Sequence, residues 1–126
     1  LFYFTIVLSF RRPEVSNLRL FLIHPAKGKP NVRYVIFIRD NMLDRAGYDE
    51  YLAVAAPTLA KHHGEIIVFN GEIEALEGAA ADGSVVIKFP DMQAARNWYY
   101  GAEYAAVKSQ RIAVTQGRAL LVAGIA

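Results

Sequence analysis

A group of aromatic side chains with one guanidinium is the most suggestive chemistry in this sequence. Trp98 and Tyr99 lie on one predicted helix, and Tyr104 and Arg111 lie seven residues apart on the next. Seven residues are about two helical turns, so Tyr104 and Arg111 share a face. An aromatic wall with one arginine suits a small planar acid or an enol. The alternative is a packed helix pair with Arg111 ion-paired at the surface, because large aromatic residues most often fill cores.

Two tyrosines of an earlier predicted helix form a second candidate. Tyr48 and Tyr51 flank Asp49 and Glu50. A phenol at the mouth of a pocket would donate a hydrogen bond to a substrate oxygen. The helical spacing of the apolar stripe also explains both tyrosines as core residues with their hydroxyls at the rim.

The histidines are weaker candidates for acid–base chemistry. His62 and His63 are adjacent, so on a helix they point about 100° apart, and no further ligand stands four residues on. We therefore predict no metal site and interpret both as solvated residues at a helix end. One of them, or Tyr48, could still act as a catalytic acid or base. His24 is predicted to be an exposed loop residue.

Composition leaves several classes of chemistry without support. The chain has no cysteine, which excludes disulfides and thiolate catalysis and fits a reducing cytoplasm. It has no glycine-rich phosphate loop and no specific grouping of Ser, His and Asp or of paired carboxylates. The net charge is +2, but the basic residues are scattered and form no stripe for nucleic acid. We expect no cofactor and no nucleic-acid partner.

Size and apolar content set the broad class of the protein. A chain of 126 residues predicts one domain. Its aromatic content of 12% argues against disorder. Its hydrophobic content of 54% is high for a lone soluble monomer, so part of the apolar surface is expected to be buried against a partner subunit.

Residues 1–31 are predicted to be an N-terminal extension, either an extra strand or strands or a flexible segment. Leu1 to Phe10 is an apolar run with Arg11 and Arg12 after it, whereas a secretory signal carries its positive charge first. Ten residues also fall far short of the roughly 20 that span a bilayer. We expect no membrane partner.

Residues 32–126 carry a regular order of predicted elements. Strands are expected at 33–39, 65–69, 84–89 and 119–125 from their β-branched and aromatic content. One helix begins after the cap Asp44, a second begins after the cap Asp91, and 103–114 continues as helix beyond an interruption at Gly101.

Several positions are predicted to break or turn the chain. Pro57 is expected to kink or break the first helix, and Gly64 to close it. Asn70-Gly71 is typical of a tight hairpin or of a bulge in one long strand, and the alternation over 72–77 leaves room for a further strand. Gly117 is expected to end the last helix.

The order β-α-β-(β)-β-α-β predicts an α+β domain with the ferredoxin-like βαββαβ sandwich. In that fold an antiparallel sheet carries its helices on one face. The other face is left bare, and an apolar bare face is usually covered by a second copy packing sheet to sheet.

Short motifs in a fixed order carry a family resemblance. They are Tyr48-Asp49-Glu50-Tyr51, His63-Gly64, Asn70-Gly71, Leu76-Glu77-Gly78, Phe89-Pro90-Asp91, Ala94-Ala95-Arg96-Asn97-Trp98-Tyr99, and Glu103-Tyr104 with Arg111. With these, residues 32–126 resemble the family named domain of unknown function 1330, of the dimeric α+β barrel superfamily. Residues 1–31 have no counterpart there, and His63-Gly64 replaces a common Gly-Gly pair.

The resemblance implies a homodimer whose two sheets face each other. It implies no reaction, because the family is named for lacking one. The wider superfamily includes cofactor-independent monooxygenases, small isomerases and heme-degrading enzymes, and such fold-level analogy is only associational.

Our preferred hypothesis is a cytoplasmic, bacterial-type homodimeric domain that binds a small molecule between its sheet and its helices. The alternatives are a cofactor-independent monooxygenase or isomerase acting on a small aromatic or enolic compound, and a purely structural interaction module. The predicted ligand-binding residues are Tyr48, Tyr51, Trp98, Tyr99, Tyr104 and Arg111.

Overall fold

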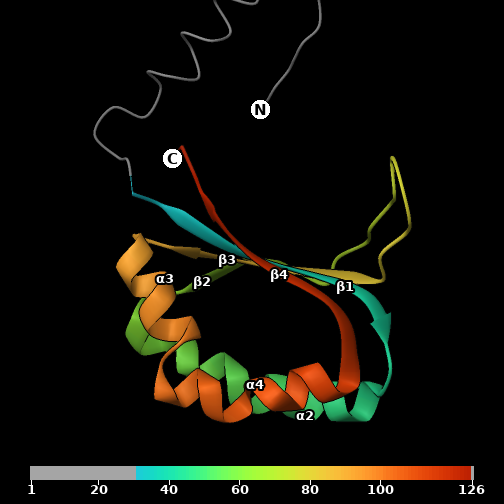
Figure 1. Cartoon of the computed structure of the whole chain (residues 1–126), viewed down its shortest axis with the longest axis horizontal. Coiled ribbons are helices and arrows are strands. Elements are labelled where there is room, and N and C mark those ends of the chain that lie inside the picture. Colours follow the sequence, from blue (N-terminus) through green and yellow to red (C-terminus); the bar gives the residue numbers. More distant parts are fainter. Residues whose placement is uncertain (1–30, 126) are drawn as a thin grey trace, which may run out of the picture. The chain divides into compact units, whose positions relative to one another are not determined.

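The computed structural model describes residues 31–125, which contain a four-stranded sheet with helices against one face (Figure 1). The predicted extension 1–31 therefore lies outside the described residues, apart from its last position. The elements, in chain order, are β1 (Arg33–Met42), α2 (Arg45–Ala55), the 3-10 helix η1 (Ala56–His62), β2 (Glu65–Phe69), β3 (Gly83–Phe89), α3 (Met92–Tyr99), α4 (Ala102–Val114) and β4 (Thr115–Ala123).

The sheet has the strand order β2-β3-β1-β4, and every neighbouring pair is antiparallel. Strand β1 lies inside the sheet, between β3 and β4. This order, with one helical layer, confirms the predicted α+β ferredoxin-like fold. No helix within residues 31–125 is both long enough and apolar enough to cross a membrane.

The first helical segment begins and breaks where its sequence predicts. The side chain of Asp44 accepts a hydrogen bond from the amide of Gly47 at 3.1 Å and so caps α2. Helix α2 stops at Ala55, and the chain continues as η1 with Pro57 in its first turn, because proline cannot donate to the preceding α-helical turn. His63, and not the predicted Gly64, takes the left-handed conformation that ends this segment, with φ of 60°.

The second helical segment begins at the predicted cap and runs to Val114, the last residue of the predicted helix, but Gly117 does not end it. Asp91 accepts from the amide of Ala94 at 2.8 Å, and Gly101 separates α3 from α4. Helix α4 ends at Val114, so the prediction that Gly117 ends it is wrong. Gly117 lies in β4, where a Cβ atom would collide with the carbonyl oxygen of Ile38. Its glycine is explained by this close approach of β1 and not by a helix terminus.

The chain between β2 and β3 also differs from the prediction. Asn70 has φ of 50°, but residues 71–82 form a long loop without a strand, so neither the two-residue hairpin nor the strand at 72–77 is present. The glutamates of this segment are exposed to solvent, and none of the four strands pairs with residues 72–77. The loop projects away from the helical layer in Figure 1.

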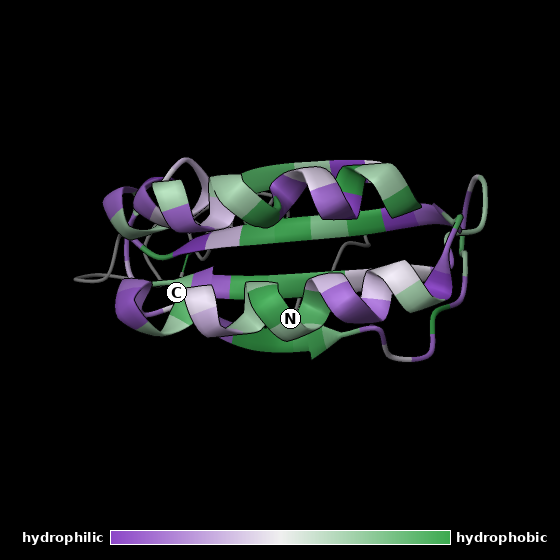
Figure 2. Cartoon of the chain, turned by 90° about the horizontal axis from the view of Figure 1, so that it is seen from below, coloured by the Kyte–Doolittle hydropathy of each residue, from purple (hydrophilic) through white to green (hydrophobic). Residues whose placement is uncertain are grey.

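The core lies between the sheet and the helices. Helix α2 packs against α4, and α3 packs against η1. Val35, Ile87 and Phe89 of the sheet are buried with Trp98 and Tyr104 of the helices. Figure 2 shows the strands as mostly hydrophobic, whereas the helices alternate between hydrophobic and hydrophilic segments, as expected for helices with one solvated side.

The sheet face away from the helices carries an apolar row across all four strands. Val68 is paired with Val86, Val86 with Ile36, and Ile36 with Leu120. These residues alternate along the strands with the buried side chains of the core, so they point to the opposite face. Val68 is 41% exposed and Leu120 is 44% exposed.

Candidate functional site

A cavity of about 220 Å³ lies between the sheet and the α2–η1 segment. Its apolar walls include Phe37, Leu59, Phe69, Val85, Ile87 and Trp98. No aspartate, glutamate or histidine lines it among the described residues, and its polar side chains are a few arginines, tyrosines and small groups. A small, mostly apolar cavity with a few polar groups is the usual form of a small-ligand site.

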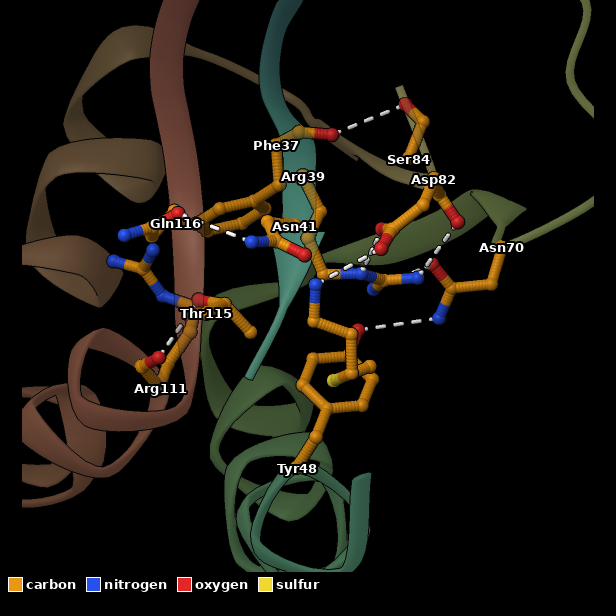
Figure 3. Close-up of polar contacts among 11 residues, drawn as sticks. Phe37, Arg39, Asn41, Tyr48, Asn70, Asp82, Ser84, Arg111, Thr115 and Gln116 are labelled. Atoms are coloured by element: carbon orange, nitrogen blue, oxygen red, sulfur yellow. Dashed lines mark hydrogen bonds and ion pairs between the residues drawn. The ribbon is translucent and has the colours of Figure 1, made fainter. Parts of the chain in front are cut away.

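Arg39, which lines the cavity, is the centre of a hydrogen-bond network (Figure 3). The Arg39 Nε donates to Asp82 at 2.6 Å, and its Nη1 donates to the Asn70 side-chain oxygen at 3.1 Å. Asn70 in turn donates to the Tyr48 hydroxyl at 3.1 Å, and the Arg39 guanidinium lies 4.8 Å from the centre of the Tyr48 ring. The network ties both ends of the 70–82 loop to β1.

The same arginine explains the small residue at the start of β3. A Cβ atom on Gly83 would collide with the Arg39 guanidinium. Glycine at this position therefore leaves room for the Arg39 side chain to lie against β3. The Asp82 carboxylate also accepts from the Met42 amide at 2.9 Å. Asp82 therefore fixes the arginine and the end of β1 together.

A second chain of hydrogen bonds links the cavity-lining residues Tyr51 and Arg111 through Tyr104. The Tyr51 and Tyr104 hydroxyl oxygens are 2.6 Å apart, and Arg111 Nε donates to the Tyr104 oxygen at 3.1 Å. Burial raises the pKa of both Tyr51 and Tyr104 above the ordinary value, because the phenolate would be poorly solvated there. Both phenols therefore stay neutral near pH 7.

Arg111 is held on a second side by an aromatic ring. Its guanidinium lies 4.9 Å from the centre of the Phe37 ring, a cation–π contact. The salt bridges found within the described residues do not include Arg111. Its positive charge is thus balanced by no carboxylate of this part of the chain.

Comparison with known proteins places the chain in a family. The model for Domain of unknown function (DUF1330) matches residues 33–125. The chain belongs to the DUF1330 family. No curated protein matches it.

Two solved structures similar to this DUF1330 chain support the fold, and a third is less similar. The methylated RPA0582 protein has a TM-score of 0.59 at 12% identity, with 92% of this chain and 93% of that chain covered. RPA0582 from Rhodopseudomonas palustris, a protein of unknown function, has a TM-score of 0.55 at 11% identity, with 92% and 95% covered. A conserved protein of unknown function from Bacteroides thetaiotaomicron, described as a possible oxidoreductase, has a TM-score of 0.45 at 13% identity, with 77% and 100% covered.

Four of the six predicted ligand-binding residues of this DUF1330 domain line the cavity. They are Tyr48, Tyr51, Trp98 and Arg111. Tyr104 does not line it but lies behind it, fully buried, where it joins Tyr51 to Arg111. Tyr99 lines a separate depression beside β4 and lies under Lys108, with the Lys108 Nζ 4.5 Å from its ring centre.

The two predicted histidines lie at the end of η1, away from the cavity lining. The His62 ring nitrogen is 3.8 Å from Glu103, which also pairs with Lys61 at 2.8 Å. The backbone of His63 takes the left-handed conformation. Glycine, as in the Gly-Gly pair that His63-Gly64 replaces, takes this conformation without strain. Within residues 31–125 there is no cluster of three or more metal-ligating side chains.

The network formed by Arg39, Asn70 and Asp82 does not follow from the sequence patterns. The patterns indicate Arg39 only as the end of a strand and Asn70 only as a turn residue. Their contact spans 31 residues of chain, and Arg39 and Asp82 are 43 residues apart. The available signal was weak: an arginine at the end of an otherwise apolar central strand needs a partner when it is buried.

Proposed function

We propose that this protein is a homodimeric small-molecule-binding domain. The observation that carries the proposal is the cavity between the sheet and α2–η1, with apolar and aromatic walls and a few polar groups in its lining. Its volume of about 220 Å³ suits a compound about the size of one substituted ring.

The apolar row on the opposite face of the sheet supports the homodimer. A row formed by Val68, Val86, Ile36 and Leu120 spans the sheet, and the next row carries Glu65 and Lys88. An apolar centre with a polar rim is the usual pattern of a protein interface. A second copy presents the same row, so packing sheet to sheet covers both apolar surfaces with a self-complementary contact.

Native mass spectrometry tests both parts of the proposal in one experiment. We expect the protein incubated with excess benzyl alcohol to appear as a dimer that carries added mass, and the denatured sample to show the bare chain. A monomer in the native spectrum would contradict the homodimer. A dimer that takes up no mass would contradict the ligand site.

A paired set of variants locates the dimer contact. Leu120→Glu places a charge in the apolar row and is expected to convert the dimer to monomer, because the charge would be desolvated in the interface. Ile112→Glu, at a position on α4 that is 59% exposed, is the matched control and should leave the dimer intact. If Ile112→Glu dissociates the dimer and Leu120→Glu does not, the contact lies elsewhere.

A cofactor-independent monooxygenase or isomerase acting on a small aromatic or enolic compound is the second candidate. The clustered pKa shifts of Tyr51 and Tyr104 at one cavity favour it. A raised pKa keeps a phenol neutral, so Tyr51 and Tyr104 can donate a proton but do not serve as bases. The described lining of the cavity offers no carboxylate or imidazole base. Incubation with acetylacetone, a small enolic compound, separates the two functions: an enzyme consumes it or takes up oxygen, and a binding domain returns it unchanged.

A further inference from the structure

Three arginines line the cavity, and two of them, Arg39 and Arg111, differ in how far their donors are used. Arg39 is fully engaged, because its Nε, Nη1 and Nη2 atoms all donate to Asp82 or Asn70. Arg111 uses only Nε, toward the Tyr104 hydroxyl, and none of the hydrogen bonds found within the described residues involves its two terminal nitrogens. It is half-buried and lines the cavity. Arg118 also lines the cavity, and its side chain makes none of the hydrogen bonds or ion pairs found within the described residues, but it is exposed on β4. Arg111 is therefore the partly buried arginine of the lining that combines an unbalanced charge with unused donors.

The direction of the Tyr51–Tyr104 hydrogen bond follows from burial. Tyr104 is fully buried, and its oxygen already accepts from Arg111. If Tyr51 were the donor, the Tyr104 proton would have no acceptor in the described core, which is unfavourable for a buried hydroxyl. Tyr104 therefore donates to Tyr51, and the proton of Tyr51 is left to point elsewhere. Tyr51 lines the cavity, so that proton is available to a ligand.

We propose that the cavity selects a small organic anion, with its carboxylate or enolate oxygen held by the terminal nitrogens of Arg111 and by the hydroxyl of Tyr51. This inference rests on the proposed small-molecule-binding function. The Tyr104 oxygen bonds both groups, so it fixes two donors in the lining of the cavity. The apolar body of the ligand then lies against Phe37, Val85 and Ile87.

The electrostatics favour an anion over a neutral ligand. Charge-assisted hydrogen bonds from arginine to carboxylate are about twice as strong as neutral ones, and arginine presents a planar pair of donors that matches a carboxylate. The described lining contains no acidic side chain that would repel the anion. Binding also supplies the negative charge that Arg111 lacks within residues 31–125.

Calorimetric titration with benzoate and with benzyl alcohol, its neutral counterpart of similar size, tests the proposal. We expect the wild-type protein to bind benzoate more tightly than benzyl alcohol by about 10-fold or more. Arg111→Gln should lose that preference while it still binds benzyl alcohol, which also shows that the variant is folded. Arg111→Lys should keep a part of the preference, and Tyr51→Phe should weaken benzoate binding more than benzyl alcohol binding.

Arg96→Gln is the matched control, because Arg96 is an exposed arginine on α3 that does not line this cavity. It should leave both affinities unchanged. Equal binding of benzoate and benzyl alcohol to the wild type would overturn the anion inference and leave the small-molecule function standing. Binding of neither compound would count against both. Loss of benzoate binding in Arg118→Gln, with Arg111→Gln unaffected, would also overturn the assignment.

Discussion

Replacing Trp98 with alanine is expected to lower the free energy of unfolding by about 3–5 kcal/mol, a large part of the roughly 5–15 kcal/mol that stabilises a typical domain. Trp98 is 2% exposed, and its ring centre lies 4.2 Å from that of Tyr104 and 5.6 Å from that of Phe89. Its indole nitrogen donates to Thr58 Oγ1 at 2.8 Å. The substitution removes these ring contacts and the hydrogen bond, and it enlarges the cavity that Trp98 lines.

Urea denaturation followed by far-ultraviolet circular dichroism is the appropriate measurement for this variant. Fluorescence is unsuitable, since Trp98 is the single tryptophan of the chain. Tyr100→Ala is the matched control, because this neighbouring aromatic is 72% exposed and should change stability by no more than about 0.5 kcal/mol. A loss below about 1 kcal/mol for Trp98→Ala would show that the ring does not pack as described.

Arg39→Met is expected to lower the free energy of unfolding by about 2–3 kcal/mol and to release the 70–82 loop. Removing one partner of a fully buried ion pair costs about 3–5 kcal/mol. The cost is smaller here because the Asp82 side chain is 42% exposed and regains water. Methionine retains much of the packing, so the loss is mainly that of the bonds to Asp82 and Asn70.

Hydrogen exchange distinguishes loop release from general destabilisation. In Arg39→Met, the amides of Asn70 and Asp82, which bond to Ser84 and Arg39 carbonyls, should exchange faster than those of β1. Arg118→Met is the matched control, because Arg118 is exposed on the neighbouring strand β4. Uniformly faster exchange over the whole sheet would contradict a local role for Arg39.

The elements set by local chemistry could be predicted from the sequence. Asp44 and Asp91 cap helices because a carboxylate next to the first helical turn satisfies free amides, whatever the rest of the fold does. Pro57 breaks α2 for an equally local reason. The order of these elements was enough to identify the ferredoxin-like fold.

Features that depend on distant neighbours could not be predicted in the same way. Gly117 looked like a helix terminus because its role, to let β1 and β4 approach, involves Ile38 far away in the chain. Asn70-Gly71 looked like a hairpin because the pattern does not reveal that Asn70 is used by Arg39.

The residues of the candidate site also divide into those that a local pattern predicts and those that depend on distant neighbours. Tyr48, Tyr51 and Trp98 could be named as cavity residues because aromatic residues on the inner face of helices must face the sheet. The role of Tyr104 as a buried link between Tyr51 and Arg111 required the tertiary contacts.

The chemical shift of the Trp98 indole N–H is the measurement that tests the small-molecule site most directly. The chain has one tryptophan, so the indole region of a proton–nitrogen correlation spectrum holds one peak from a residue that lines the cavity. Titration with benzoate is expected to move this peak to saturation with one ligand per protomer. If the peak stays in place while the methyl signals of Ile36 and Val86, whose side chains point to the opposite sheet face, move in a proton–carbon spectrum, the ligand binds outside the cavity and the proposed site is wrong.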